Sequence, residues 1–256
     1  MSATRYFDAL DAILQRIRST QAAQLEEAGA IMAAVISGGG RVYLFGSGHS
    51  VIPVMDVFPR YGSFVGFYPL YDPRLMWSNV VGPHGARELL WIERREGYAQ
   101  QFLQSYPMGP GDCLTVFSHG GMNAAPIEAA IYARERGTKV VTVSSHENAR
   151  VARRSHSSGK VLSDLADVAI DNCVAPEDAQ VDVGRREKVA AGSTLAAVSI
   201  AMALVAETGA RLAAAGFEFQ TFVSPNVPGV APDHNLRVFD AYARKWHERA
   251  PEPVVR

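Results

Sequence analysis

The sequence has 256 residues, of which 48% are hydrophobic and 20% charged, and its 25 basic and 26 acidic residues leave a formal net charge of -1. This composition is typical of globular proteins and excludes wholesale disorder, a collagen and a coiled coil. Because the balanced charge gives no overall attraction to phosphate backbones or anionic lipid, we expect neither nucleic acid nor a membrane as a partner.

Two cysteines, Cys113 and Cys173, lie in apolar or strand-like sequence. They exclude a disulfide scaffold and a four-thiolate zinc site, and two buried reduced thiols are the simplest interpretation. The first residues lack the apolar core and cleavage site of a signal peptide, and no apolar run approaches the ~20 residues that cross a bilayer. We therefore expect a cytoplasmic protein.

The first part of the chain predicts helices followed by a strand, a turn and a helix. Residues 3–37 carry apolar side chains at mostly three- and four-residue steps, which indicates one long or two consecutive amphipathic helices. A strand over 41–45 leads through a glycine-containing turn into a helix over 51–61, and 64–68 resembles a second strand. An irregular segment rich in proline and glycine then precedes one helix over 88–105.

The same pattern repeats further along the chain. A strand over 112–117 and a helix over 125–136 are followed by strands over 139–143 and 168–171. An alanine-rich helix over 192–215 is apolar on most sides, which favours a buried position in the domain or at a subunit contact. A last amphipathic helix covers residues 233–249.

Short strands alternating with helices predict an α/β fold, a three-layer sandwich with helices on both faces of a parallel, doubly wound sheet. The chain shows no linker between two cores and no long repeat, so one domain is the economical interpretation. We divide it into N-terminal helices (1–37), the sheet core with the buried helix (38–220) and a C-terminal helical segment (221–256).

Three turns that follow predicted strands share glycines and hydroxyl side chains. Ligands of an open parallel sheet bind beyond the carboxyl ends of its strands, so these turns are expected to meet. Their N–H groups and hydroxyls can form a phosphate cradle without lysine. The turns are Gly46-Ser47-Gly48-His49-Ser50, Ser118-His119-Gly120-Gly121-Met122-Asn123 and Ser144-Ser145-His146.

Known nucleotide patterns do not match these turns. Val51 stands where the third glycine of G-x-G-x-x-G falls, which speaks against a nicotinamide cofactor. The segment His156–Lys160 lacks the earlier glycine and the following hydroxyl of a Walker A loop. A metal held by His49, Asp56 and His234 is conceivable, but no metal-binding spacing supports it. We expect neither a cofactor nor a metal.

The Gly46–Ser50 turn, its flanking strand and helix, and the strand that ends in the Ser118–Asn123 turn resemble the SIS (sugar isomerase) family of phosphosugar-binding domains. The resemblance spans almost the whole chain and is closest to a bacterial branch of the family, through four further segments. It implies a flavodoxin-like sandwich that binds sugar phosphates at serine-rich loops, as a homodimer or homotetramer with sites at subunit contacts. The four segments are Asn123–Glu128, Ser155–Lys160, Asp167–Cys173 and Asp233–Asn235.

The resemblance assigns hydroxyls of the first turn, and of the start of the 192–215 helix, to substrate contacts, although Ser193 could equally be a plain helix N-cap. The second turn departs from the family pattern Ser-x-Ser-Gly-x-Ser/Thr, because it lacks the middle hydroxyl and carries Asn123 in place of the last. The substrate-binding residues that we predict are Gly46, Ser47, Gly48, Ser50, Ser118, Gly121, Asn123, Ser144, Ser145, Ser193 and Thr194.

Aldose–ketose isomerisation needs an acid and a base near neutral pH, for which histidine and carboxylate suit. Of the carboxylates, Asp56 could instead pair with Arg60, Glu187 could be solvated, and Glu128 is a further candidate. His49 lies inside the first turn, and the resemblance implies a C-terminal histidine, here His234, sometimes donated across a subunit boundary. His119 and His146 are weaker candidates, and His84, His156 and His247 are interpreted as surface groups. The predicted catalytic residues are His49, Glu187, His234 and Asp56.

The sequence therefore predicts an enzyme that isomerises a sugar phosphate by proton transfer. Two alternatives remain open: a non-catalytic sugar-phosphate sensor, and a lyase or etherase acting on an amino-sugar phosphate. Turnover separates the sensor from the enzymes, and product analysis separates the two enzymes.

Overall fold

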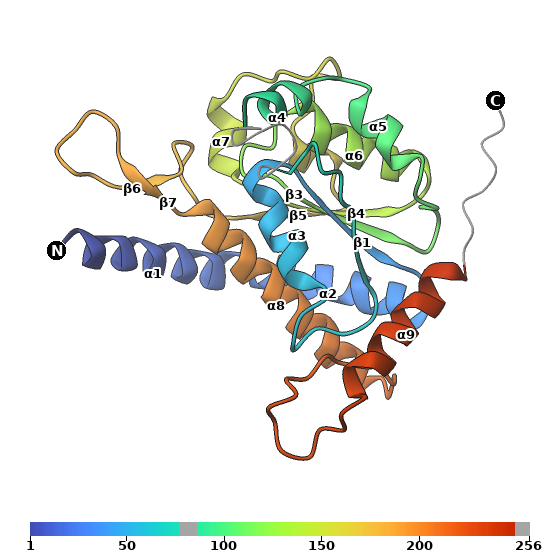
Figure 1. Ribbon diagram of the computed structural model, residues 1–256. Coiled ribbons are helices and arrows are strands. Elements are labelled where there is room, and N and C mark those ends of the chain that lie inside the picture. Colours follow the sequence, from blue (N-terminus) through green and yellow to red (C-terminus); the bar gives the residue numbers. More distant parts are fainter. Residues whose placement is uncertain (77–85, 249–256) are drawn as a thin grey trace.

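The computed structural model describes residues 1–76 and 86–248 (Figure 1). Its centre is a five-stranded parallel sheet in the order β2-β1-β3-β4-β5. The order reverses between β1 and β3, so the loops that leave their carboxyl ends diverge and open a crevice. The strands are β1 (Val42–Gly46), β2 (Phe67–Pro69), β3 (Cys113–Phe117), β4 (Lys139–Ser144) and β5 (Val168–Asp171).

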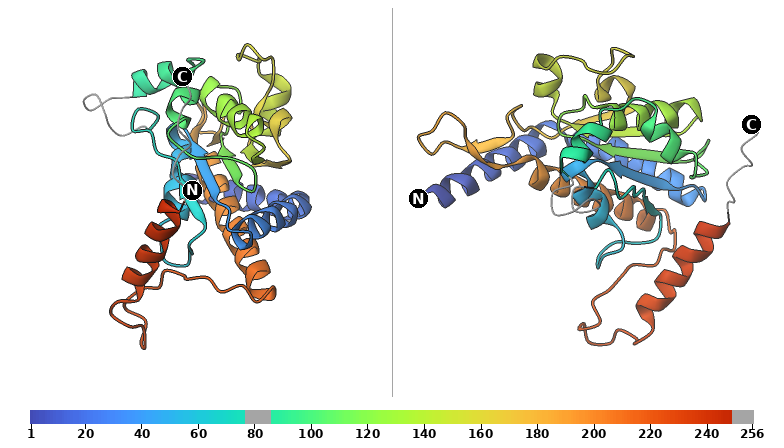
Figure 2. Two further views of the ribbon diagram at one scale, coloured as in Figure 1. Left: turned by 90° about the vertical axis from the view of Figure 1, so that its right-hand side faces the viewer. Right: turned by 45° about the horizontal axis from the view of Figure 1, so that its top comes forward.

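Helices cover both faces of the sheet, as Figures 1 and 2 show, which confirms the predicted three-layer α/β fold. Alternate strand residues face opposite layers: Val42 and Leu44 join one buried apolar cluster, Tyr43 and Phe45 the other. The first layer holds α1 (Ser2–Thr20), α2 (Ala22–Ser37), α3 (Val51–Val57) and α8 (Ser193–Ala214). The second holds α4 (Ala86–Ile92), α5 (Tyr98–Leu103) and α6 (Ala124–Glu135).

The last helix, α9 (His234–His247), packs at the edge of the sheet beside β2. The ring of Tyr242 stacks on that of Tyr68 with centroids 5.1 Å apart. Buried Arg41, which precedes β1, donates from Nη2 to the carbonyls of Lys245 and Trp246 at 2.6 and 3.0 Å. A cation bonded to the last carbonyls of a helix also offsets the negative end of its dipole, so Arg41 fastens α9 to the sheet.

The structure corrects the sequence prediction at three places. The helix predicted over 88–105 is two helices: α4 ends at Ile92, and Gly97, with a φ of 91° that favours glycine, is the N-cap at which α5 begins. The strand predicted over 64–68 begins later, since β2 covers Phe67–Pro69, whereas a helix, α7 (His146–Val151), does follow the third turn. Two three-residue strands, β6 (Ala179–Val181) and β7 (Val189–Ala191), form an antiparallel hairpin beside α1 that was too short for its periodicity to be recognised.

Both cysteines are free and buried, as predicted. Burial raises the pKa of the Cys113 thiol to about 12, so this side chain stays a neutral, unreactive core residue at physiological pH. Within the described residues, α8 is the one helix with the length and hydropathy of a membrane span. Its buried side chains pack against α2 in the first helical layer.

The contact between α8 and α2 predicts a large effect of truncating α8. Ile200 on α8 is fully buried, so Ile200→Ala is expected to lower the free energy of unfolding by about 2–5 kcal/mol through lost burial and a residual cavity. The matched variant Ile52→Ala changes a side chain that is 37% exposed. Urea unfolding of both variants checks the prediction, and equal losses would contradict the assigned packing.

Candidate functional site

A small pocket lies at the carboxyl ends of the strands, where the loops after β1, β3 and β5 and strand β4 meet the N-terminus of α8. Five of the predicted site residues, from distant parts of the chain, come together here. They are His49 and Ser50 of the first turn, Ser118 of the second turn, and Ser193 and Thr194 at the start of α8. The lining residues of the pocket are His49, Ser50, Ser118, His119, Val143, Asn172, Ser193, Thr194 and Ala197.

The glycines of these turns shape the backbone. A Cβ on Gly46 would lie 2.1 Å from the carbonyl oxygen of Ser50, so no side chain fits where the chain folds back on itself. Gly48 has a φ of 61°, a left-handed conformation that favours glycine. The tight turn that follows places His49 and Ser50 at the pocket. Gly46 and Gly48 thus make the loop possible through their backbone geometry.

A buried carboxylate that sequence reasoning missed joins the first two turns. Glu93, in the break between α4 and α5, is 6% exposed. Its Oε2 accepts a hydrogen bond from Ser47 Oγ at 3.0 Å, and its Oε1 accepts one from Asn123 Nδ2 at 2.8 Å. Its carbonyl accepts from the N–H of Ala125, in the first turn of α6, at 2.9 Å. One residue therefore connects the loop after β1 to the loop after β3.

Burial raises the pKa of the Glu93 carboxyl, while the hydrogen bond from Ser47 and the charge of Arg94 oppose that shift. Glu93 does not itself line the pocket, but it bonds to the two turns whose neighbouring residues do. A buried carboxylate with a raised pKa at such a place is a functional candidate on physical grounds. Glu93 is not among the site residues predicted from the sequence, because one continuous helix is predicted over this stretch. The charged run that ends in Gly97 was the signal that could have revealed the break.

The neutral tautomer of His119 can be read from its neighbours. The amide of Asn172 is oriented by its Oδ1, which accepts from the N–H of Val174 at 3.0 Å. Its Nδ2 therefore donates to Nδ1 of His119 at 3.1 Å. In the neutral ring Nε2 then carries the hydrogen, and this buried atom has no hydrogen-bond partner among the described residues. His119, a weaker candidate in the sequence, is thus a positioned donor in the pocket.

Two serines of the third turn serve the fold. Ser145 is fully buried; its hydroxyl donates to the carbonyl of Val174 at 2.6 Å and accepts from the N–H of Asn148 at 3.1 Å, which caps α7. Ser144 is buried in β4, behind Gly121 of the second turn. Neither serine lines the pocket, and Gly121, with a φ of 63°, has a conformational role.

The structure leaves three predicted catalytic residues outside the pocket. Asp56 forms an exposed ion pair with Arg60 at 2.6 Å, the structural alternative considered from the sequence. The side chain of Glu187 is 79% exposed in the loop between β6 and β7. His234 Nε2 lies 2.8 Å from the carbonyl of Thr221, which bridges to Phe64 near the amino end of β2, at the opposite edge of the sheet.

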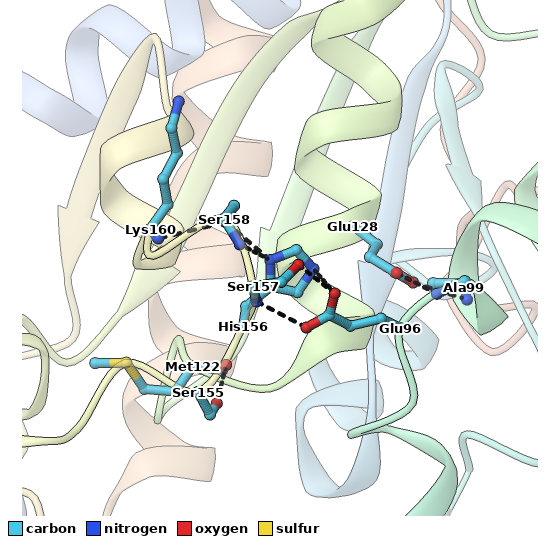
Figure 3. Close-up of polar contacts among 10 residues, drawn as sticks. Glu96, Ala99, Met122, Glu128, Ser155, His156, Ser157, Ser158 and Lys160 are labelled. Atoms are coloured by element: carbon cyan, nitrogen blue, oxygen red, sulfur yellow. Dashed lines mark hydrogen bonds and ion pairs between the residues drawn. The ribbon is translucent and has the colours of Figure 1, made fainter.

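The segment Ser155–Lys160 lies against the α4–α5 break (Figure 3). Ser157 donates to Glu96 from its backbone N–H at 2.7 Å and from its hydroxyl. These bonds lower the pKa of the Glu96 carboxyl. The Oγ of Ser155 donates to the carbonyl of Met122 at 2.8 Å, which ties the segment to the second turn. The segment Ser155–Lys160 therefore forms a wall, in the sense of a stretch of chain packed against the α4–α5 break and the second turn, beside the loops that Glu93 connects.

The ring of His156 lies in this wall, with its side chain 7% exposed and Nε2 3.8 Å from Glu96 Oε2. The expectation that it is a surface group is therefore wrong, whereas His247 is exposed and His84 lies outside the described residues. Glu128 accepts N–H bonds from Gly97 and from Ala99, the latter at 3.2 Å, and so caps α5. Over residues 1–76 and 86–248, no group of three or more His, Cys, Asp or Glu residues is arranged to hold a metal ion.

Comparison with known proteins shows the family. A family model described as SIS domain matches residues 5–145. A UPF0309 protein of Streptomyces coelicolor is 32% identical over 244 residues, covering 95% of this chain and 96% of the relative. One from Brucella ovis is 35% identical over 248 residues, covering 96% and 97%.

Among solved structures, a phosphoheptose isomerase from Francisella tularensis superimposes with a TM-score of 0.54 at 13% identity, covering 81% of this chain and 96% of the other. One from Neisseria gonorrhoeae gives 0.50 at 15% identity, covering 80% and 97%. At these identities the likeness concerns the fold. From the family match and the nearly full-length relatives, the chain belongs to the SIS-domain family and groups there with the UPF0309 proteins.

Proposed function

We propose that the chain binds a sugar phosphate in the pocket at the carboxyl edge and isomerises it between aldose and ketose by proton transfer, in the cytoplasm. The observation that carries this proposal is Glu93, a buried carboxylate held between the first two loops by Ser47 and Asn123. Membership of the SIS family and the phosphoheptose isomerase fold agree with it.

In this proposal Glu93 is the base. It takes the proton from the carbon beside the sugar carbonyl and returns it to the former carbonyl carbon, so that one hydrogen moves between neighbouring carbons. A second hydrogen has to move from the hydroxyl of that carbon to the former carbonyl oxygen, and Nε2 of His119 balances this exchange by giving its proton to one oxygen and receiving a proton from the other. Its raised pKa makes the carboxylate a stronger base than an ordinary glutamate. The two hydrogen bonds to its oxygens hold it in one orientation. As negative charge develops on the carbonyl oxygen, the Nε2–H of His119 donates to it.

The first prediction concerns the base. Glu93→Gln keeps the size of the side chain but removes the proton acceptor, so turnover is expected to fall by about 10²–10⁴-fold. The measurement is NMR of sugar phosphates in D₂O, which follows loss of the C2 proton signal as well as product. Glu88→Gln, on the exposed face of α4, is the matched control. A fully active Glu93→Gln protein would refute the proposal.

A wild-type protein that binds a sugar phosphate without exchange or product would indicate the sensor instead, and release of an acid would indicate the lyase.

The second prediction concerns pH. The base must be ionised, so kcat/KM is expected to fall as pH decreases through a pKa that lies above the usual glutamate value of 4.5. Arg94, 3.9 Å from Glu93, lowers that pKa, so Arg94→Gln should move the acid limb to higher pH. Arg95→Gln removes the same charge one residue further on. A profile that Arg94→Gln leaves in place would rule out Glu93 as the titrating base.

The exposed apolar residues beside the pocket support the further proposal of a homodimer or homotetramer. Phe7 on α1, Val189 on β7 and Leu195 on α8 are exposed, and the hydroxyl of Tyr6 donates to the carbonyl of Ala191 at 2.7 Å, which holds α1 against the hairpin. Figure 1 shows these three elements side by side. Exposed apolar side chains on neighbouring elements favour a protein contact at this face.

Light scattering during size exclusion is expected to give at least twice the mass of one chain. Leu195→Glu places a charge in the contact, so this variant should shift toward the monomer. Val151→Glu, at an exposed position on α7, is the control. A monomeric wild-type protein would contradict the proposed assembly.

A further inference from the structure

The hydroxyl of Ser193, which lines the pocket, donates its hydrogen bond to a protein carboxylate and not to the pocket. Ser193, the first residue of α8, donates from Oγ to Oδ2 of Asp178 at 2.8 Å. Oδ1 of the same carboxylate accepts from the N–H groups of Gly192 and Ser193 at 3.0 and 2.7 Å. Asp178 adopts a φ of 61°, a left-handed conformation that aspartate tolerates better than most residues.

This contact fixes the polarity of Ser193. A hydroxyl has one hydrogen to donate, and the ionised carboxylate of Asp178 can only accept. Ser193 therefore presents lone pairs to the pocket that it lines. A phosphate oxygen is itself an acceptor, and it would meet those lone pairs with the charge of Asp178 behind them. The same carboxylate occupies two N–H groups at the start of α8 that an anion would otherwise use.

The loop after β3 has the opposite polarity. The Oγ of Ser118 accepts from the N–H of Gly121 at 3.2 Å, so its hydrogen is available to a ligand in the pocket. His119 carries an Nε2–H at the same side. Donors thus lie on the β3 side of the pocket, and an acceptor backed by a carboxylate lies on the α8 side.

We propose that Asp178 is a positioning residue that makes Ser193 an acceptor, so that the α8 side of the pocket selects an O–H or N–H group of the sugar and excludes its phosphate. This inference rests on the proposed function, because it assumes that the pocket binds a phosphorylated sugar. It assigns the phosphate to the donors on the β3 side. A sugar hydroxyl and a sugar amine share the chemistry that the α8 side recognises.

The test is the binding of inorganic phosphate to Asp178→Asn. In this variant Oδ1 still accepts the two N–H groups, while Nδ2 donates to Ser193 and turns its hydrogen toward the pocket. Asparagine also tolerates the left-handed backbone. The phosphate concentration that gives half of the thermal stabilisation, at fixed ionic strength, is expected to fall about tenfold, a size reasonable for one unit charge lost near an anion.

Glu177→Gln is the matched control, because it removes the same charge from the neighbouring exposed residue, whose carboxylate pairs with Lys188 at 2.7 Å. Its phosphate response is expected to equal that of the wild-type protein. An unchanged or weaker response of Asp178→Asn would overturn the proposal. An equal gain in both variants would also overturn it, because a general charge effect would then suffice.

Ser193→Ala keeps the inference testable if Asp178→Asn does not fold. Since Ser193 gives phosphate no hydrogen, its removal should leave the phosphate response unchanged, and a weakened response would overturn the proposal. Removal of the acceptor should weaken binding of an unphosphorylated hexose or of the corresponding 2-amino hexose, and the larger loss identifies which group is recognised; a loss of neither would overturn it. These binding measurements need no turnover, so their outcome is independent of the Glu93 exchange experiment.

Discussion

The carboxylate of Glu93 has to be compensated where it lies, because a buried charge has lost its hydration and can recover it only from fixed hydrogen-bond donors. Ser47 and Asn123 supply these donors from the loops after β1 and β3, which diverge at the reversal of strand order. One side chain thereby connects the two loops that diverge at the reversal of strand order. Both loops, the break between α4 and α5 and the start of α6 are positioned around it, and the pocket residues follow from that arrangement.

Hydroxyl groups around the pocket are equivalent in the sequence but not in the structure. Ser193 and Ser118 both line the pocket, but Ser193 donates to a protein carboxylate, whereas Ser118 accepts from a backbone N–H. Since a hydroxyl has a single hydrogen, the two differ in what they offer a ligand. A turn rich in serine therefore indicates that hydrogen bonds to a ligand are possible there. The neighbouring protein groups determine whether each hydroxyl donates to the ligand or accepts from it.

The carboxyl ends and the amino ends of the strands have separate roles. At the carboxyl edge, loops with their glycines and hydroxyls surround the pocket. At the amino edge, Arg41 and the aromatic contacts of Tyr242 fasten α9. His234 belongs to the second group, because the first turn of α9 follows the chain that pairs with Phe64. Neither His234 nor Glu187, which is 79% exposed on the β6–β7 hairpin, lines the pocket.

The sequence by itself determined the α/β class, the helices before residue 38, four of the five central strands to within one residue at each end and the gathering of three turns at one edge of the sheet. These features follow from local periodicity and from glycines whose backbone requirements are independent of distant contacts. Tertiary structure alone decided which carboxylate is buried, which ring nitrogen of His119 carries hydrogen and which serines donate inward. Glu93 gains its role through Asn123, which is 30 residues away in the sequence. Asp178 gains its role through Ser193, which is 15 residues away. Burial and hydrogen-bond direction depend on such neighbours, and no local pattern in the chain encodes them.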